Sequence, residues 1–133
     1  MIATSKAKGS RAERELLHMF WEHQFWCIRV AGSGSMPLPC PDLLAGKKGK
    51  SIAIECKSSK ADRIYIEPKQ IDELQQFAHG FGAESWIGVR FNNMDWHFVH
   101  PKNLGRNGGK KYFVSKDLIA EKGISFAKFI NER

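Results

Sequence analysis

The chain has 133 residues, 42% of them hydrophobic and 26% charged, which is typical of one globular domain and excludes a largely disordered chain. No apolar run approaches the roughly 20 residues of a membrane helix, and the three cysteines form no C-x-x-C pair, which argues against a structural zinc site. The formal net charge of +7 indicates a polyanionic partner, of which nucleic acid is the commonest.

We find no internal repeat and no long linker, so residues 1–133 are expected to form a single domain, with residues 1–8 as a flexible basic arm. The N-terminus carries no apolar signal segment, and unpaired cysteines fit a reducing compartment. We therefore expect a cytoplasmic protein, associated with the nucleoid when its partner is DNA.

The first predicted element is a helix over residues 10–24. Ser10 and Glu13 have the spacing of a capping box at its start, and the following residues form an apolar face at helical spacing: Leu16, Leu17, Phe20 and Trp21. At about 100° per residue, Glu13 lies in the middle of this apolar arc, where a carboxylate without a partner is costly. Two explanations are open: Glu13 caps the helix by bonding back to the Ser10 amide, or it lies beside a metal ion.

Three strands are expected after this helix. The first covers residues 25–31 and leads into a long loop rich in Gly, Ser and Pro over residues 32–41. Residues 42–46 and 51–57 are predicted to form two further strands, joined by a short basic turn. The turn brings these two strands alongside each other.

Asp42, Glu55 and Lys57 are the candidate catalytic residues of these strands. Residues two apart share a face of a strand, so Glu55 and Lys57 point together and Asp42 converges on Glu55 from the neighbouring strand. Two adjacent carboxylates repel each other, and a hard cation such as Mg²⁺ removes that conflict. With a lysine to stabilise charge on a phosphate, or to orient and deprotonate a water, such a site would hydrolyse a phosphodiester. The alternative is a solvated strand face beside an ordinary turn.

The second half of the chain alternates helices and strands. A helix begins after Glu67, with Pro68 in its first turn, and ends at Gly80 or Gly82. The remaining predicted elements are a hairpin of residues 86–91 and 96–100, a flexible basic loop over 105–111, and short helices over 116–122 and 125–130. The order α-β-β-β-α-β-β predicts an α/β domain with a central mixed sheet flanked by helices.

The motifs together resemble those of the archaeal Holliday-junction resolvases, a branch of the PD-(D/E)-x-K nuclease superfamily. The resemblance covers about residues 8–100 and rests on Ala12-Glu13-Arg14-Glu15-Leu16, Pro41-Asp42-Leu43-Leu44-Ala45-Gly46 and Ala53-Ile54-Glu55-Cys56-Lys57, with shorter matches at 8–9, 25–33, 65–66, 70–78, 81–83 and 89–91. It implies a restriction-endonuclease-like fold and metal-dependent cutting of two opposed strands of a four-way DNA junction during recombination and repair. The alternatives are a non-catalytic DNA-binding module of this fold and a nuclease that acts on other DNA structures.

The resemblance also implies roles for individual residues. Glu13, Asp42 and Glu55 correspond to the acidic metal site, the backbone carbonyl of Cys56 to a further ligand, and Lys57 to the catalytic lysine. We expect Mg²⁺ as the ion, with Mn²⁺ as its substitute, and metal ligation becomes the favoured explanation of Glu13. A serine implicated in activity corresponds to Ser33 in the loop after the first strand.

DNA contacts and a homodimer complete the predicted functional surface. The candidate DNA-binding residues are Lys6, Lys8, Arg11, Arg14, Arg29, Lys60, Lys110 and Lys111, with a solvated charge run as the alternative. Phe77 and Phe81 correspond to aromatics of the family's dimer interface, although their apolar stripe would equally fit a core-facing helix. A two-fold dimer presents two equivalent sites to a junction that has two strands to cut. A sliding clamp or another recombination protein is a further candidate partner.

Overall fold

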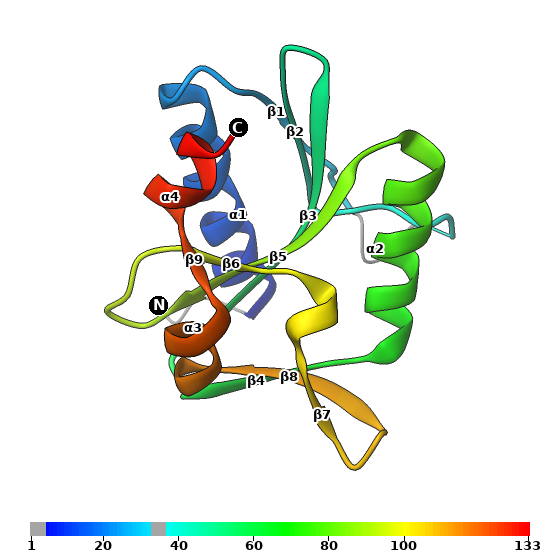
Figure 1. Ribbon diagram of the computed structural model, residues 1–133, viewed down its shortest axis with the longest axis vertical. Coiled ribbons are helices and arrows are strands. Elements are labelled where there is room, and N and C mark those ends of the chain that lie inside the picture. The colour runs from blue at the N-terminus through cyan, green and yellow to red at the C-terminus, as the bar shows by residue number, and fades with distance from the viewer. Residues whose placement is uncertain (1–4, 33–36) are drawn as a thin grey trace.

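The computed structural model describes residues 5–32 and 37–133, and within them a six-stranded mixed sheet forms the centre of the domain. Helices α1 (Ser5–Glu22) and α4 (Phe126–Asn131) cover one face of this sheet, and α2 (Pro68–Phe81) covers the other (Figure 1). None of the described helices is long and apolar enough to cross a membrane. The α/β class with a mixed sheet flanked by helices, predicted from the sequence, is confirmed.

The strands of the large sheet are ordered β1-β2-β3-β5-β6-β9. Their bounds are β1 Trp26–Arg29, β2 Leu43–Lys47, β3 Lys50–Ser59, β5 Glu84–Phe91, β6 His97–Val99 and β9 Ile124–Ser125. Strands β3 and β5 are parallel, and the chain between them includes α2; the other neighbours are antiparallel. A parallel pair needs a long crossover connection, and here that crossover brings the start of α2 close to β3.

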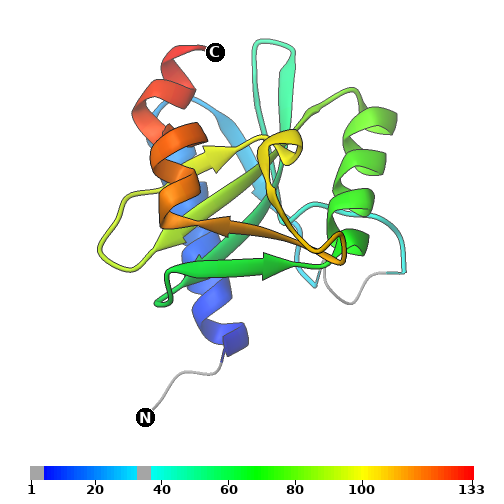
Figure 2. The same cartoon turned by 60° about the horizontal axis from the view of Figure 1, so that its bottom comes forward.

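A smaller three-stranded sheet of the described residues, ordered β4-β8-β7, packs beside the large one (Figure 2). It consists of β4 Arg63–Ile66, β8 Lys111–Ser115 and β7 Gly105–Asn107, and it leads into α3 Lys116–Lys122. The prediction of a flexible loop over residues 105–111 is therefore wrong. Tertiary packing explains the difference, because the Phe113 ring fills the space where a Cβ on Gly105 would lie, 2.2 Å from it. Residues 105–107 are thus a strand and residues 108–110 a turn, and the absence of a Cβ on Gly105 lets the Phe113 ring pack against the backbone.

Helix α1 also differs from its prediction. It begins at Ser5 rather than at residue 10, so Ser10 lies inside the helix and does not cap it. The capping-box explanation of Glu13 is therefore wrong. Residues 5–8, expected as part of a flexible arm, are helical, while residues 1–4 lie outside the described residues.

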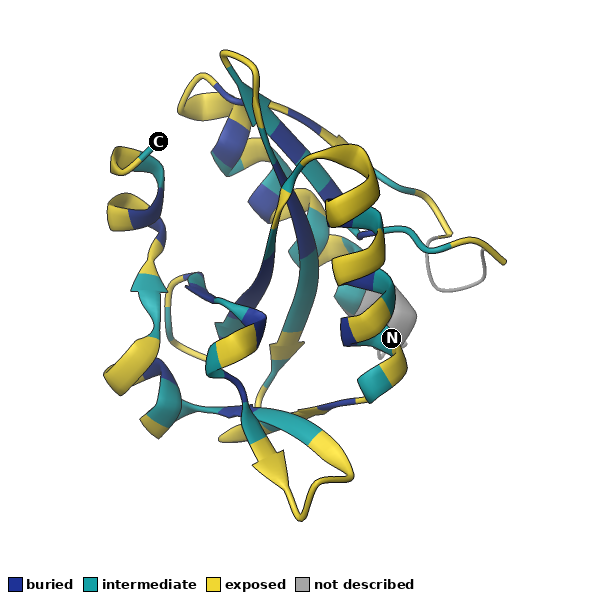
Figure 3. Cartoon of the chain, turned by 45° about the vertical axis from the view of Figure 1, so that its right-hand side comes forward, coloured by how far each residue is buried: buried dark blue, intermediate teal, exposed yellow. Residues whose placement is uncertain are grey.

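The described residues form two hydrophobic clusters, one on each face of the large sheet. Leu16 and Phe20 of α1 pack with Phe126 and Phe129 of α4 on the first face. On the second face, α2 packs through Ile71, Leu74 and Ala78. Figure 3 shows the buried residues gathered on the sheet, with the outer faces of the helices exposed. The sheet is thus a rigid support for residues near its strand ends.

Strands β2 and β3 are joined by a two-residue turn of Lys48 and Gly49, whose φ angles of 51° and 82° are both left-handed. Turns with two left-handed residues match the twist of a β-hairpin. The turn sets a register in which Leu43 lies opposite Ile54. Since Asp42 directly precedes Leu43, this register places it beside the residues that follow Ile54 on β3.

Candidate active site

Asp42 is held at the start of β2 by hydrogen bonds from both neighbouring strands. Its N–H donates to the Ile54 carbonyl at 3.0 Å, and its own carbonyl accepts from the Val30 N–H at 2.9 Å. Its carboxylate Oδ2 accepts a hydrogen bond from the Cys56 N–H at 2.8 Å. The carboxylate is therefore fixed beside β3 at the level of Glu55.

The carboxylates of Glu13, Asp42 and Glu55 share one electrostatic environment. Burial, followed by the charge of Asp42, raises the pKa of Glu55 to about 8, and Lys57 offsets only part of this effect. Burial and the charge of Asp42 also raise the pKa of Glu13 above its ordinary value, against the opposing effect of Arg29. Negative charge at this point is thus incompletely compensated by the residues around it.

Glu13 reaches this environment from α1 and is paired with a cation of β1. Arg29 Nε lies 3.2 Å from Glu13 Oε1, and its Nη2 donates to Ser10 Oγ at 2.8 Å. The long-range ion pair, rather than a helix cap, accounts for this carboxylate on an otherwise apolar arc. Arg29, which the sequence predicts to contact DNA, thus forms an ion pair and a hydrogen bond within the chain itself.

Lys57 and Glu55 are bridged by Gln70, a residue of α2 that the sequence analysis did not select. The Gln70 amide oxygen accepts from Lys57 Nζ at 3.2 Å, and its Nε2 donates to Glu55 Oε2 at 3.4 Å. Lys57 Nζ also lies 3.8 Å from Glu55 Oε2. The capping box of α2 orients the same amide, because the Glu67 N–H donates to Gln70 Oε1 at 3.4 Å. A capping-box glutamine is visible in the sequence, but its second role depends on how α2 packs against β3.

The donor set is suited to a hard divalent cation. Mg²⁺ and similar ions take oxygen ligands, chiefly carboxylates, and a cation would relieve the raised pKa values of Glu13 and Glu55. Among residues 5–32 and 37–133, however, no three His, Cys, Asp or Glu side chains gather as closely as a complete metal site requires. Glu13 is drawn to Arg29 instead, so it would have to loosen or share that ion pair in order to act as a third ligand.

The other predicted site residues are distributed around this cluster. Exposed side chains are those of Arg11, Arg14, Lys60, Lys110 and Lys111. Lys111, on the β7–β8 hairpin, forms an ion pair at 3.2 Å with Glu67, the N-cap residue that directly precedes α2. Ser33 lies outside the described residues, and Lys6 and Lys8 fall in the first turns of α1, where side chains lie outside the described part.

Phe77 and Phe81 lie one turn apart on α2, with their rings stacked at a centroid distance of 5.3 Å. Phe81 is 56% exposed, and Phe77 packs partly against the core. A core-facing stripe would bury both rings, so that explanation does not hold for Phe81. Pro39 lines a shallow surface hollow together with the same two rings.

Comparison with known proteins assigns the family. The model of the archaeal Holliday junction resolvase (Hjc) family matches residues 4–133. The chain belongs to this family. The crossover junction endodeoxyribonuclease Hjc of Archaeoglobus fulgidus is 38% identical over 132 residues, which cover 96% of each chain. The crossover junction endodeoxyribonuclease Hjc of Methanocaldococcus jannaschii is 35% identical to this chain. That alignment covers 92% of this chain and 86% of that protein.

A solved structure supports the same assignment. The 1.6 Å resolution structure of Archaeoglobus fulgidus Hjc, described as a Holliday junction resolvase from an archaeal hyperthermophile, matches with a TM-score of 0.84 and 34% identity. The match covers 92% of this chain and 99% of that one. The family, the fold and the endodeoxyribonuclease class predicted from the sequence are thereby confirmed, and the acidic cluster of this Hjc-family chain is consistent with a divalent metal cofactor.

Proposed function

We propose that the protein resolves four-way DNA junctions by hydrolysing one phosphodiester in each of two opposed strands. The observation that carries the proposal is the half-buried cluster of Asp42, Glu55 and Lys57 in a chain of the Hjc family. The net charge of +7 supports a polyanionic substrate. A non-catalytic DNA-binding module would have no need of a cluster in which Asp42 helps to raise the pKa values of Glu13 and Glu55.

Asp42 and Glu55 are the residues proposed to hold the metal, joined by Glu13 and the backbone carbonyl of Cys56, and we propose Mg²⁺ with Mn²⁺ as its substitute. When bound, such an ion lowers the pKa of a water and neutralises charge on the phosphate. The Cys56 N–H fixes the Asp42 carboxylate in advance of binding. The chain therefore supplies an ordered ligand rather than a mobile one.

Lys57 is proposed to stabilise negative charge on the phosphate. Its Nζ donates to Gln70 and lies near Glu55, and an ammonium group has three N–H donors. At least one donor therefore remains for a phosphate oxygen. The contacts of Nζ with two acceptors favour this role over removal of a proton from water, the other possibility left open by the sequence.

Gln70 is proposed to be a positioning residue for both Lys57 and Glu55. Its amide oxygen accepts from the ammonium and its amide nitrogen donates to the carboxylate, so the group fixes the positions of both side chains. Because the Glu67 N–H also donates to the amide oxygen, the start of α2 fixes which end of the amide faces which partner. Groups that orient metal ligands typically contribute about 10- to 100-fold to affinity or activity.

A homodimer is proposed through the surface that contains Phe77 and Phe81. An exposed pair of stacked aromatic rings fits a protein interface better than a solvent-facing helix, and an isologous dimer would present two equivalent sites to the two strands. Phe81→Asp should shift the protein from dimer to monomer in sedimentation velocity, while Gln75→Asp on the same helix should not. A wild-type monomer at micromolar concentration would contradict this proposal.

The decisive experiment compares cleavage of a synthetic four-way junction with cleavage of a linear duplex of matched sequence, in Mg²⁺ or in EDTA. We expect paired cuts in opposed strands of the junction in Mg²⁺, much slower cutting of the duplex, and no cutting in EDTA. Equal cleavage rates on the junction and the duplex would indicate a nuclease that acts on DNA structures other than four-way junctions. Junction binding without any cutting would favour the non-catalytic module.

A further inference from the structure

The small sheet β4-β8-β7 has one buried face and one exposed face. Ile66 of β4 and Val114 of β8 are fully buried and belong to the hydrophobic cluster that α2 also joins. Because side chains alternate along a strand, Tyr65 and Phe113 lie on the opposite, outer face, and the register of β4 and β8 places them directly across from each other (Figure 2). Tyr65 is 49% exposed. The outer face of this sheet therefore presents aromatic side chains to solvent.

An arginine lies on the same face as the two rings. Arg63 is two residues before Tyr65 on β4, and its guanidinium lies over the Phe113 ring, 4.1 Å from the ring centroid. The Tyr65 ring meets the Phe113 ring edge-on at a centroid distance of 6.4 Å. Gly105 on β7 leaves room for the Phe113 ring, because a Cβ there would lie 2.2 Å from it. Arg63, Tyr65 and Phe113, which we call the aromatic face, thus hold two planar groups at the surface over a third.

The charges of the small sheet favour an anionic partner. Its three strands carry Arg63, Arg106 and Lys111 and no carboxylate. The carboxylates that flank β4, those of Asp62 and Glu67, each form an ion pair with a lysine at 3.2 Å. Arg63 itself makes its cation–π contact and, among the described residues, no ion pair. The N–H donors of its guanidinium are therefore available to an anion that reaches the aromatic face.

Unpaired nucleobases combine the two properties that this face would recognise. A base has a planar apolar surface that stacks on aromatic rings and on guanidinium groups, and the strand that carries it is anionic. Bases inside a duplex already stack on their neighbours, so the ligand is a strand with unpaired bases. Strand β4 connects the end of β3 to the start of α2, the elements that carry Lys57 and Gln70. The aromatic face is thus joined by the chain, at both ends of β4, to elements of the candidate active site.

We propose that the outer face of the small sheet binds unpaired bases of a DNA strand. A base stacks on the Tyr65 ring, and Arg63 supplies a second planar surface and the cation for the adjoining phosphate. Arginine suits both tasks, since its planar group stacks on aromatic faces and binds phosphate oxygens through paired N–H donors. Phe113 is a positioning residue that supports Arg63 from below. The inference goes beyond junction cleavage, because this contact needs neither a metal ion nor the carboxylates of the candidate active site.

The first test compares two single strands that differ only in their bases. Fluorescence anisotropy in EDTA would give the Kd of the wild type for a labelled oligothymidylate, and for a strand of equal length in which abasic sites replace the thymidines. The phosphates are the same in both, so the electrostatic part of binding is the same. Stacking of one base should make the oligothymidylate bind about 5- to 150-fold more tightly than the abasic strand.

The second test changes the ring without changing the charge. Tyr65→Leu keeps an apolar side chain on β4 but has no aromatic surface, so the Kd for the oligothymidylate should rise by about 5-fold or more, while the Kd for the abasic strand stays the same. Tyr65→Phe keeps the ring and should bind both strands as the wild type does. Arg63→Lys keeps the charge but loses the planar group, so it should weaken binding of the oligothymidylate alone. Trp26→Leu, which removes a 73% exposed ring from the edge strand β1, is the control and should change neither Kd.

A preference for the oligothymidylate that Tyr65→Leu loses and Tyr65→Phe keeps would establish the stacking site. Equal binding of the two strands by the wild type would overturn it, and so would a Tyr65→Leu variant that keeps the wild-type Kd. The aromatic pair would then serve only to stabilise the sheet, as cross-strand pairs do. Equal losses in Tyr65→Leu and Trp26→Leu would also overturn it, because the bases would then stack without regard to place.

Thermal unfolding of each variant separates a lost contact from damaged folding. If Tyr65→Leu does not fold, the comparison of the two strands on the wild type and the comparison of Arg63→Lys with the wild type decide the question. Junction cleavage by the wild type is measured independently of these results. Failure of the stacking site would therefore leave the proposed function intact, and a wild type that cuts no junction would leave the stacking site to be judged by its own two tests.

Discussion

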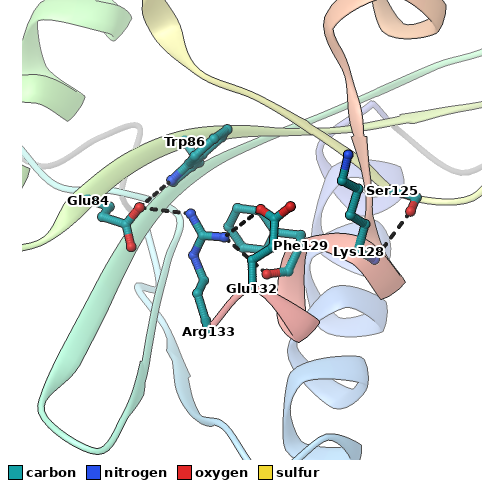
Figure 4. A network of polar contacts seen from close by, with 7 residues as sticks. All are labelled: Glu84, Trp86, Ser125, Lys128, Phe129, Glu132 and Arg133. Atoms are coloured by element: carbon teal, nitrogen blue, oxygen red, sulfur yellow. Dashed lines mark hydrogen bonds and ion pairs between the residues drawn. The ribbon is translucent and has the colours of Figure 1, made fainter.

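Two charged clusters lie along the parallel strands β3 and β5, and their charges are arranged in opposite ways. At the start of β5, Arg133 Nη2 donates to Glu84 Oε1 at 2.8 Å and Nη1 donates to the Phe129 carbonyl at 3.0 Å, as Figure 4 shows. The guanidinium also lies over the Phe129 ring, 3.9 Å from its centroid. Farther along β3, the candidate active site instead brings carboxylates toward one another.

The pKa values express this difference. Burial alone would raise the pKa of Glu84, but hydrogen bonds from Arg133 and Trp86 hold it below its ordinary value. Burial and Asp42 raise the pKa of Glu55 to about 8. The first cluster matches charge with charge and ties the C-terminal helix to the sheet. The second leaves negative charge incompletely compensated within the chain, and carboxylates with raised pKa values of this kind are typical of functional sites.

Among the variants that test this comparison, Asp42→Asn is expected to have the largest effect. The amide oxygen still accepts from the Cys56 N–H, but the site loses a ligand charge, so junction cleavage in Mg²⁺ should fall by about 10²- to 10³-fold or more. Junction binding in EDTA should persist. Removing the charge should also raise the thermal midpoint of the metal-free protein, because it relieves Glu55. Normal cleavage by this variant would show that the site is assigned to the wrong residues.

Gln70→Ala should have the next largest effect. Loss of the bridging amide leaves Lys57 and Glu55 without their shared partner, and cleavage should fall by about 10- to 100-fold, the range for groups that orient metal ligands. Junction affinity in EDTA should be unchanged, because Gln70 is not proposed to touch DNA. Gln75→Ala, at an exposed position on the same helix, is the control. A change in affinity without a change in cleavage rate would contradict the positioning role.

Arg133→Ala tests the cluster in which charges are matched. It removes the contacts with Glu84 and Phe129, and the free energy of unfolding measured with urea should fall by about 1–3 kcal/mol. Cleavage measured well below the unfolding transition should stay normal, since this cluster lies away from the residues of β3 that are proposed to be catalytic. A variant with normal stability would show that the C-terminal contacts contribute little; a variant with reduced kcat at full stability would show that the two clusters are coupled.

The smallest predicted effect is a pH dependence of stability due to Glu84. Its native pKa is lowered, so the unfolded chain takes up the proton first and stability falls as the pH drops through the native pKa. Because this carboxylate is 46% exposed, the contribution should stay below about 1 kcal/mol. Glu84→Gln should flatten the stability curve between about pH 5 and 3. If the stability of Glu84→Gln falls with decreasing pH as steeply as that of the wild type, other carboxylates must cause the acid sensitivity.

Local rules predicted much of the fold because they act over a few residues. The proline after Glu67 and the left-handed Gly82, with φ 89°, mark the two ends of α2 where the sequence placed them. The alternation along β3 correctly put Glu55 and Lys57 on one face, since both contact Gln70 from that face. The rule failed at residues 105–111, where glycines indicated a loop but residues 105–107 form a strand in which Gly105 leaves room for the Phe113 ring.

The sequence by itself determined the E-x-K strand, the turn that brings Asp42 to it, and the resemblance to the resolvases that the relatives confirm. Each of these depends on strand periodicity, short turns or a joint pattern of residues. Only the tertiary structure decided that Glu13 pairs with Arg29 and that Gln70 bridges Lys57 and Glu55. These partners come from different elements, and their meeting depends on how α1 and α2 pack against the two faces of the sheet, which no local spacing records.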